Sequence, residues 1–182
     1  MVVNYRLFLQ IFFLFAPFFL TGCVQMQNNH PNPGTSENCT QRVIIASDRL
    51  AKEGIQIIRL GDDVRIIIPS DNIFVRGTPR LKRSYFPSLD AVIVLVNSYE
   101  KIAVKIAGYT DNLGSYERNL ALSKQQTSNL MHYLSLNGLD TRILSAEGFG
   151  SGDPISSNND AFGRAKNRRI EITFRYLPVV EE

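Results

Sequence analysis

Apolar and polar positions divide most of this chain into short strands and helices. Between Lys101 and Tyr109 apolar residues alternate with polar ones, which predicts a half-buried strand. Apolar residues recur every three or four positions over 89–99, which predicts a helix with Ser88 as its N-cap. The same criteria predict a second helix over 115–136, a short one near 163–167, and further strands over 54–60, 63–68, 142–148 and 169–176.

The order of these elements indicates the fold class. The turn dipeptide Gly61-Asp62 separates the first two strands, so they are predicted to pair as a hairpin. Beyond them strands alternate with helices, and a strand ends the series. This order predicts an α/β sandwich in which the helices pack on one face of a mixed sheet. Residues 70–86 are irregular, and we interpret their basic residues as a solvated loop rather than a phosphate or lipid-headgroup site. These residues are Arg76, Arg80, Lys82 and Arg83.

A run of apolar residues over 7–20 sets the N-terminus apart. It follows the basic residue Arg6 and is shorter than the roughly 20 apolar residues that cross a bilayer, so it is typical of a signal peptide. A buried helix or an uncleaved anchor is the less favoured alternative. Leu20-Thr21-Gly22-Cys23 closes the run and resembles the lipobox of bacterial lipoproteins, whose cysteine thiol carries diacylglycerol. We predict a lipoprotein signal peptide over 1–22, a flexible tether with lipidated Cys23 over 23–40, and a folded domain over 41–182.

The residues beside the lipobox bear on location. Val24 follows Cys23 where enterobacterial lipoproteins retained at the inner membrane have aspartate. By that resemblance the mature protein goes to the outer membrane and faces the periplasm. The second cysteine, Cys39, then has no partner within the chain. We predict an unpaired thiol at the start of the fold rather than a bridge to another chain.

Charge and residue content exclude several function classes. The formal net charge of +3 includes Arg6, so the mature chain is nearly neutral and nucleic acid is not expected as a partner. Two histidines, His30 in the tether and His132 in the second predicted helix, and one remaining cysteine cannot assemble a nucleophile–base pair or a metal cluster. We therefore expect no enzymatic activity, no catalytic residue, no metal and no cofactor.

Two motifs carry the strongest functional signal. The first is AGYTDNLG over 107–114, followed by Asn119 and Leu122-Ser123, and the second is GRAKNRRIEI over 163–172. In this order they resemble the signature of the OmpA C-terminal family, which includes the peptidoglycan-associated lipoproteins. The resemblance covers the chain from Gly54 onward and implies an OmpA-like α/β sandwich. It departs at Tyr109, where the family usually has histidine.

The resemblance implies a ligand, the diaminopimelate side chain of peptidoglycan, which presents an ammonium and a carboxylate on one carbon. Asp111 matches the family aspartate that takes the ammonium, and backbone N–H groups at the following helix start would add donors for the carboxylate. The family arginine that binds the carboxylate falls at Gln126, which has neither the charge nor the planar guanidinium. Arg118 lies about 80° round the helix from it, and Lys124 faces elsewhere, so neither is expected to replace it. The missing cation predicts binding weaker by about one to two orders of magnitude.

Other matching positions have structural explanations. Asn119 is predicted to bond the turn that holds Asp111, and Asp111 itself could be an ordinary turn residue that caps the helix. Arg164 and Arg168 are predicted to tie the last helix to loop carbonyls or acidic side chains, with Arg168 mainly structural. The candidate peptidoglycan-binding residues are Asp111, Thr110, Asn119, Gln126 and Arg164.

Two function classes remain. The first is a binding module, an outer-membrane lipoprotein whose domain contacts the cell wall. The second is an assembly protein whose domain docks inside a larger envelope complex, and the missing cation at Gln126 raises this option. The short lipoprotein layout with one domain also resembles a lipoprotein of Dot/Icm type IVB secretion systems, which implies other secretion-complex proteins as partners.

Overall fold

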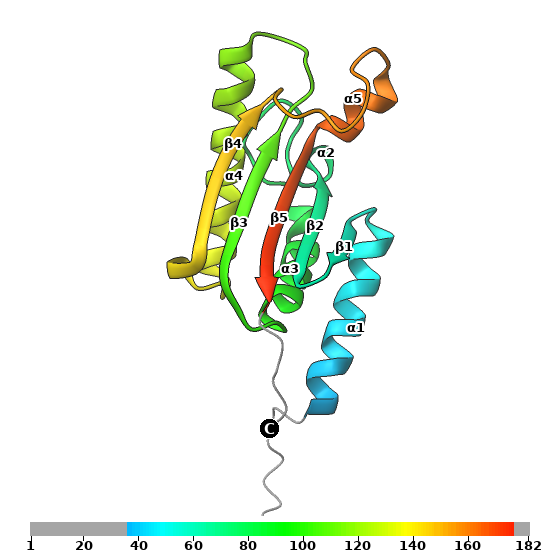
Figure 1. Ribbon diagram of the computed structural model, residues 1–182, viewed down its shortest axis with the longest axis vertical. Helices are drawn as coiled ribbons and strands as arrows, with labels where there is room; N and C mark the ends of the chain where they lie inside the picture. Colours follow the sequence, from blue (N-terminus) through cyan, green and yellow to red (C-terminus); the bar gives the residue numbers. More distant parts are fainter. Residues whose placement is uncertain (1–35, 177–182) are drawn as a thin grey trace, which may run out of the picture. The chain divides into compact units, whose positions relative to one another are not determined.

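Five strands form one mixed sheet in the order β1-β2-β5-β3-β4 (Figure 1). The computed structural model describes residues 36–176, and side chains from residue 40 onward. Strands β3 and β4 are parallel, whereas β1, β2, β5 and β3 pair antiparallel in that order. The strands are β1 (Gln56–Leu60), β2 (Asp63–Pro69), β3 (Lys101–Tyr109), β4 (Leu144–Gly150) and β5 (Arg169–Tyr176).

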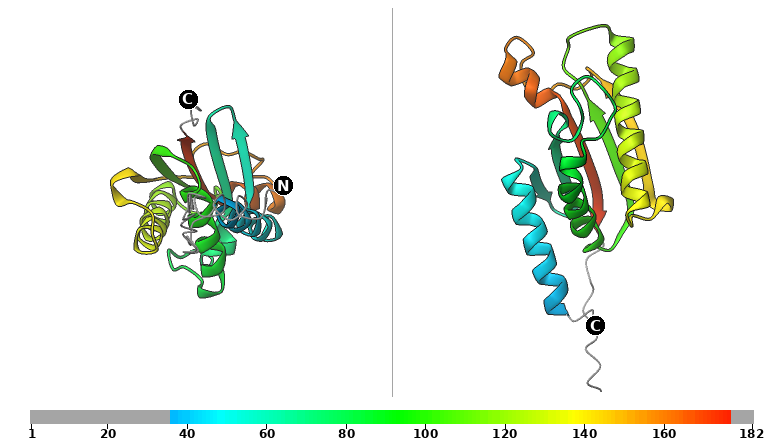
Figure 2. Two further views of the ribbon diagram at one scale, coloured as in Figure 1. Left: turned by 90° about the horizontal axis from the view of Figure 1, so that it is seen from below. Right: turned by 180° about the vertical axis from the view of Figure 1, so that it is seen from behind.

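Three long helices cover one face of this sheet, as Figure 2 shows in the view from below. They are α1 (Ser36–Lys52), α3 (Phe86–Asn97) and α4 (Tyr116–Leu136), and the shorter helical segments are α2 (Ser70–Ile73), η2 (Arg83–Tyr85), η3 (Thr141–Ile143) and α5 (Ala161–Asn167). The apolar side chains between helices and sheet form one core. Its fully buried members include Leu50, Val64, Ile66, Leu89, Val96, Val104, Ile106, Leu130, Leu134, Ile170 and Ile172. The predicted α/β sandwich with helices on one face of a mixed sheet is confirmed.

Helix α4 packs against β3 and β4 at positions where only glycine leaves room for it. A Cβ added at Gly108 would come within 2.6 Å of the Thr127 Cγ2 atom, and one added at Gly148 would collide with the Lys124 backbone. The Ser123 hydroxyl accepts a hydrogen bond from the Gly150 N–H at 2.9 Å. This contact fixes the first half of α4 against the end of β4.

Several element boundaries differ from the sequence predictions. Helix α3 begins at Phe86 after Tyr85, and Pro87 occupies its first turn, so the predicted N-cap Ser88 lies buried inside the helix. The predicted strand over 142–148 begins at Leu144, because η3 takes the preceding residues. Ile102 was expected on the apolar face of β3 but is 71% exposed, since the pairing of β3 with β5 is irregular there.

The predicted N-terminal segments are largely outside the described residues. The signal peptide over 1–22 and the lipidation site Cys23 lie outside them altogether. Helix α1 begins at Ser36, within the range 23–40 that was expected to be tether, and it includes Cys39. The part of the predicted tether from residue 36 to residue 40 is therefore helical.

Candidate functional site

The strand order brings three charged residues together at one end of the sheet. Strands β2 and β3 both pair with β5, and Pro69 and Tyr109 are both opposite Arg169. The segments that follow β2 and β3 therefore lie on either side of the segment that precedes β5. Asp71 follows β2, Asp111 follows β3, and Arg168 precedes β5.

Arg168 forms ion pairs with both aspartates. Its Nη1 atom lies 2.7 Å from Asp111 Oδ2, and its Nη2 atom lies 2.7 Å from Asp71 Oδ2. The side chains of Arg168 and Asp111 are 16% and 10% exposed. The hydrogen bond to Asp71 is the largest cause of a raised pKa at Arg168, and the bond to Asp111 adds to it against the opposing effect of burial. Two carboxylates against one guanidinium leave one net negative charge at the centre of the site.

A network of local hydrogen bonds holds the turn that carries Asp111. The Leu113 N–H donates to Asp111 Oδ1 at 3.0 Å, and the Thr110 hydroxyl donates to the Asp111 carbonyl at 2.9 Å. From the first turn of α4, the Asn119 amide donates to the carbonyls of Asp111 and Leu113 at 3.2 and 3.1 Å. The predicted hydrogen bond from Asn119 to the turn that holds Asp111 is confirmed. Asp111 acts as a turn residue, and its side chain also reaches Arg168.

A cavity of about 290 Å³ lies beside this cluster. Four of the five candidate residues border it, namely Asp111, Thr110, Asn119 and Gln126. The fifth, Arg164, does not border it, because its Nη1 atom donates to the Asn158 carbonyl at 2.8 Å in the loop before α5. A larger cavity of about 690 Å³ lies between α1 and α3 and contains no residue of either motif.

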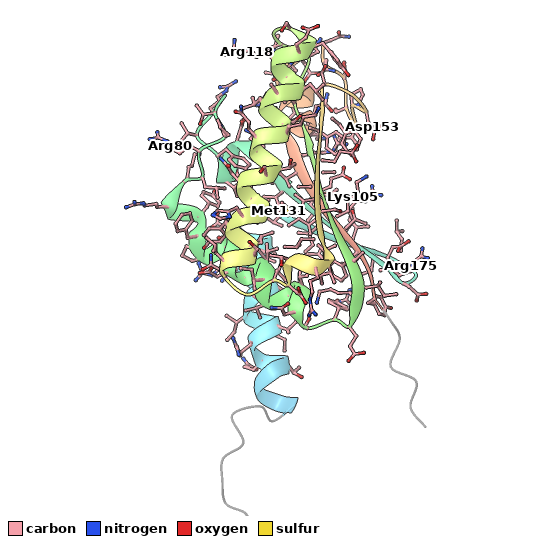
Figure 3. The ribbon with its side chains drawn as sticks, turned by 90° about the vertical axis from the view of Figure 1, so that its left-hand side faces the viewer. Arg80, Lys105, Arg118, Met131, Asp153 and Arg175 are labelled. Carbon is pink, nitrogen blue, oxygen red and sulfur yellow. The ribbon has the colours of Figure 1, made fainter. Side chains whose placement is uncertain are left out.

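The cations of this cavity differ from the prediction. Arg118, about 80° round the helix from Gln126, is not expected to replace the family arginine, yet both residues border the same cavity. Arg76 of the irregular loop also borders it. Lys124, as expected, does not border it. Figure 3 shows Arg118 at the N-terminal end of α4. Both arginines are exposed at the rim.

Gln126 is 4% exposed, and its amide is engaged with the protein itself. Its Nε2 atom donates to the Thr78 carbonyl at 3.0 Å. One helical turn further on, Asn129 donates to the Pro79 carbonyl at 2.8 Å. These two amides fasten the irregular loop to α4.

Tyr109, which stands at the family's usual histidine position, also borders the cavity, while its ring packs on the face of the sheet away from α4. Gly108 faces α4, and successive strand residues point to opposite faces. The Tyr109 ring stacks on Phe149 with centroids 5.2 Å apart, and the Arg169 guanidinium lies 3.8 Å from its centroid. Arg169 is itself paired with Glu171 at 2.7 Å. Burial raises the pKa of Tyr109.

Sequence reasoning missed Asp71 and the central position of Arg168. The predicted pairing of Arg168 with acidic side chains is confirmed, but the two partners place it inside the candidate site. The signal available was the position of Asp71 three residues after the strand predicted over 63–68. Its use would have required knowing that this strand lies beside the last one.

Within residues 36–176, no three or more His, Cys, Asp or Glu side chains are grouped so as to hold a metal ion. In the same range no helix combines the length and apolar content needed to cross a membrane.

The fold is shared with solved proteins. One is the cell wall anchor of the T6SS from Pseudomonas aeruginosa, with a TM-score of 0.65 and 24% identity, covering 73% of this chain and 94% of that one. The OmpA family model matches residues 73–168, which include both motifs up to Arg168. The chain belongs to the OmpA family.

Relatives of known name match over part of their length. The probable lipoprotein YiaD of Escherichia coli strain K12 is 33% identical over 130 residues, which are 71% of this chain and 59% of that one. The peptidoglycan-binding protein ArfA of Mycobacterium tuberculosis is 35% identical over 115 residues, which are 63% of this chain and 31% of that one. The chain thus spans less than two thirds of the length of either relative.

Proposed function

We propose that this protein is an outer-membrane lipoprotein whose OmpA domain binds peptidoglycan through the zwitterionic end of diaminopimelate. The observation that carries the proposal is the Arg168 guanidinium held between Asp71 and Asp111 beside a cavity. The net negative charge there suits an ammonium group. Membership of the OmpA family and the name of the relative ArfA support the same ligand class.

Asp111 retains the capacity to accept more hydrogen bonds. Oδ1 accepts one bond from the Leu113 N–H and Oδ2 accepts one from Arg168, whereas each carboxylate oxygen has two lone pairs. An ammonium in the cavity could therefore bond Asp111 without breaking the turn. A charge-assisted bond of this kind contributes about 1.5–3 kcal/mol when it is shielded from water.

Asp111→Asn tests this proposal, because the amide keeps an oxygen for the turn but removes the charge. We expect binding of the full-length protein, purified in detergent, to isolated sacculi to weaken by about tenfold or more, the value of one charge-assisted bond. Asp153→Asn is the matched control, since Asp153 does not border the cavity and its positive φ of 56° suits asparagine (Figure 3). Unchanged binding by Asp111→Asn would leave Asp111 as a turn residue only and refute the site.

The membrane part of the proposal rests on the sequence. The lipobox ending at Cys23 would attach the protein to lipid, and Val24 favours the periplasmic face of the outer membrane. The lipid would hold one end of the chain at the membrane, and the domain would reach the wall. YiaD, also described as a lipoprotein, is consistent with this layout.

A narrower proposal concerns the complex in which the protein works. The short lipoprotein layout, the single domain and the neutral Gln126 resemble DotK, also called IcmN, the lipoprotein of Dot/Icm type IVB secretion systems. We propose a place in the outer-membrane core complex of such a system, and the alternative is a general tether between outer membrane and wall. Crosslinking of the full-length protein in its own cells distinguishes the two. Secretion-complex proteins among the products support the first, and wall fragments without them support the second.

A further inference from the structure

The cluster of Asp71, Arg168 and Asp111 carries one net negative charge, which a zwitterion cannot balance alone. Arg168 is already paired with two aspartates, and position 126 offers a neutral amide that is bonded to Thr78. The ligand carboxylate therefore needs another cation at the cavity. Arg76 and Arg118 border it, and neither side chain makes a hydrogen bond or ion pair within residues 40–176.

Arg76 is the second residue of a hydrogen-bonded β-turn. The Thr78 N–H donates to the Val75 carbonyl at 2.9 Å, which closes a four-residue turn. Gly77, the third residue, has a φ of 69°, the left-handed conformation that a type II turn requires. The Thr78 hydroxyl donates to the same Val75 carbonyl at 2.8 Å, and the Val75 N–H is bonded to the Arg80 carbonyl at 2.9 Å. The turn therefore fixes the backbone at Arg76.

Helix α4 holds this turn at the rim of the cavity. Gln126 bonds the carbonyl of Thr78, the last residue of the turn, and Asn129 bonds the carbonyl of Pro79 next to it. Residues three apart on a helix lie on the same face, so the two amides act side by side. Gln126 is thus placed to position the turn rather than to contact a ligand.

We propose that Arg76 supplies the carboxylate-binding cation of this site and that Gln126 positions it, an inference that rests on the proposed peptidoglycan-binding function. Arg76 of the loop takes the place of the family arginine. The family position on α4 is Gln126, whose amide bonds the loop instead. Asp111 and Arg76 border the cavity from two different segments, the end of β3 and the loop after α2. That arrangement fits an ammonium and a carboxylate on one carbon.

Arg76→Gln and Arg80→Gln form a matched pair for the test. Both remove one positive charge from the same loop, but only Arg76 borders the cavity, and Figure 3 shows Arg80 on the side of the loop away from α4. We expect Arg76→Gln to weaken binding of the full-length protein to sacculi by about tenfold or more, as one charge-assisted contact is lost. Arg80→Gln should stay within about twofold of the unchanged protein, the effect of a screened surface charge.

A double-mutant cycle of Gln126→Met and Arg76→Gln tests the role of Gln126. Gln126→Met keeps the side-chain length but removes the donor to Thr78, so it should weaken sacculus binding while Arg76 is present. In the Arg76→Gln background it should cause no further loss, because the turn then has no cation to position. Additive losses of binding would mean that Gln126 acts independently of Arg76. The melting temperatures of all variants show whether a loss of binding comes from general unfolding instead.

Four outcomes would overturn the inference. Equal losses from Arg76→Gln and Arg80→Gln would indicate a general effect of charge, and a loss from Arg118→Gln without one from Arg76→Gln would move the cation to α4. If Asp111→Asn loses binding while Arg76→Gln binds as before, the inference is overturned but the proposed function is not. No binding by the unchanged protein would overturn the proposed function as well.

Discussion

The charged residues of the site differ in how far the sequence could predict them. Asp111 was found because the strand end, the turn and the helix start are adjacent in the chain. Asp71 was not found, because its contact with Arg168 joins residues 97 positions apart. That contact depends on β2 lying beside β5, which no local pattern encodes. From the sequence alone, the neutral Gln126 indicates a lost ligand contact. The structure shows that its amide instead bonds the Thr78 carbonyl of the loop packed on α4.

Arg168 should be the residue of the site on which stability depends most. Arg168→Met removes the partner of two carboxylates, one of them almost buried, and leaves their repulsion uncompensated. We expect the free energy of unfolding in urea to fall by about 2–3 kcal/mol. Arg164→Met is the control, because Arg164 bonds a single loop carbonyl, and it should cost about 1 kcal/mol. Equal losses from the two variants would contradict the central role of Arg168.

The sequence predicted the strands of the sheet better than it predicted the N-terminal helix. Strands β3 and β5 match the predicted ranges residue for residue, because their alternation and their neighbouring turns are clear. Helix α1 was missed because few of its residues contact the core. Ala46 and Leu50 are buried, but Ile44 and Ile45 are 50% and 57% exposed, so the apolar spacing is blurred. The predictable elements are those whose burial pattern is regular.

The stability of the domain should depend on the close packing of α4 on β4. Gly148→Ala would drive a methyl group into the Lys124 backbone, so α4 must shift away from the sheet. We expect a loss of about 1–3 kcal/mol in the free energy of unfolding, as for overpacked cores. Gly152→Ala, whose added Cβ would meet only the Phe149 carbonyl at 3.1 Å, should cost less. A Gly148→Ala variant as stable as the unchanged protein would show that α4 can move freely.

For the whole molecule, the proposed function requires two attachments at separate places in the chain. The lipid would be carried by Cys23, outside the described residues, and the proposed wall site lies where β2, β3 and β5 meet. A domain that binds the wall without a lipid would not connect it to the membrane. The two attachments should therefore be separable by single substitutions.

Cys23→Ser tests this separation, because a hydroxyl does not replace the thiol that accepts diacylglycerol. We expect a precursor that is not processed, does not incorporate labelled palmitate and no longer fractionates with the outer membrane as a lipidated protein. Its purified form should still bind sacculi as the unchanged protein does, since the site is distant in sequence from residue 23. Cys39→Ser is the matched control and should be lipidated normally, because Cys39 lies in α1 and not in the lipobox. Normal processing of Cys23→Ser would refute the lipid anchor, and loss of wall binding in the same variant would show that the two attachments depend on each other.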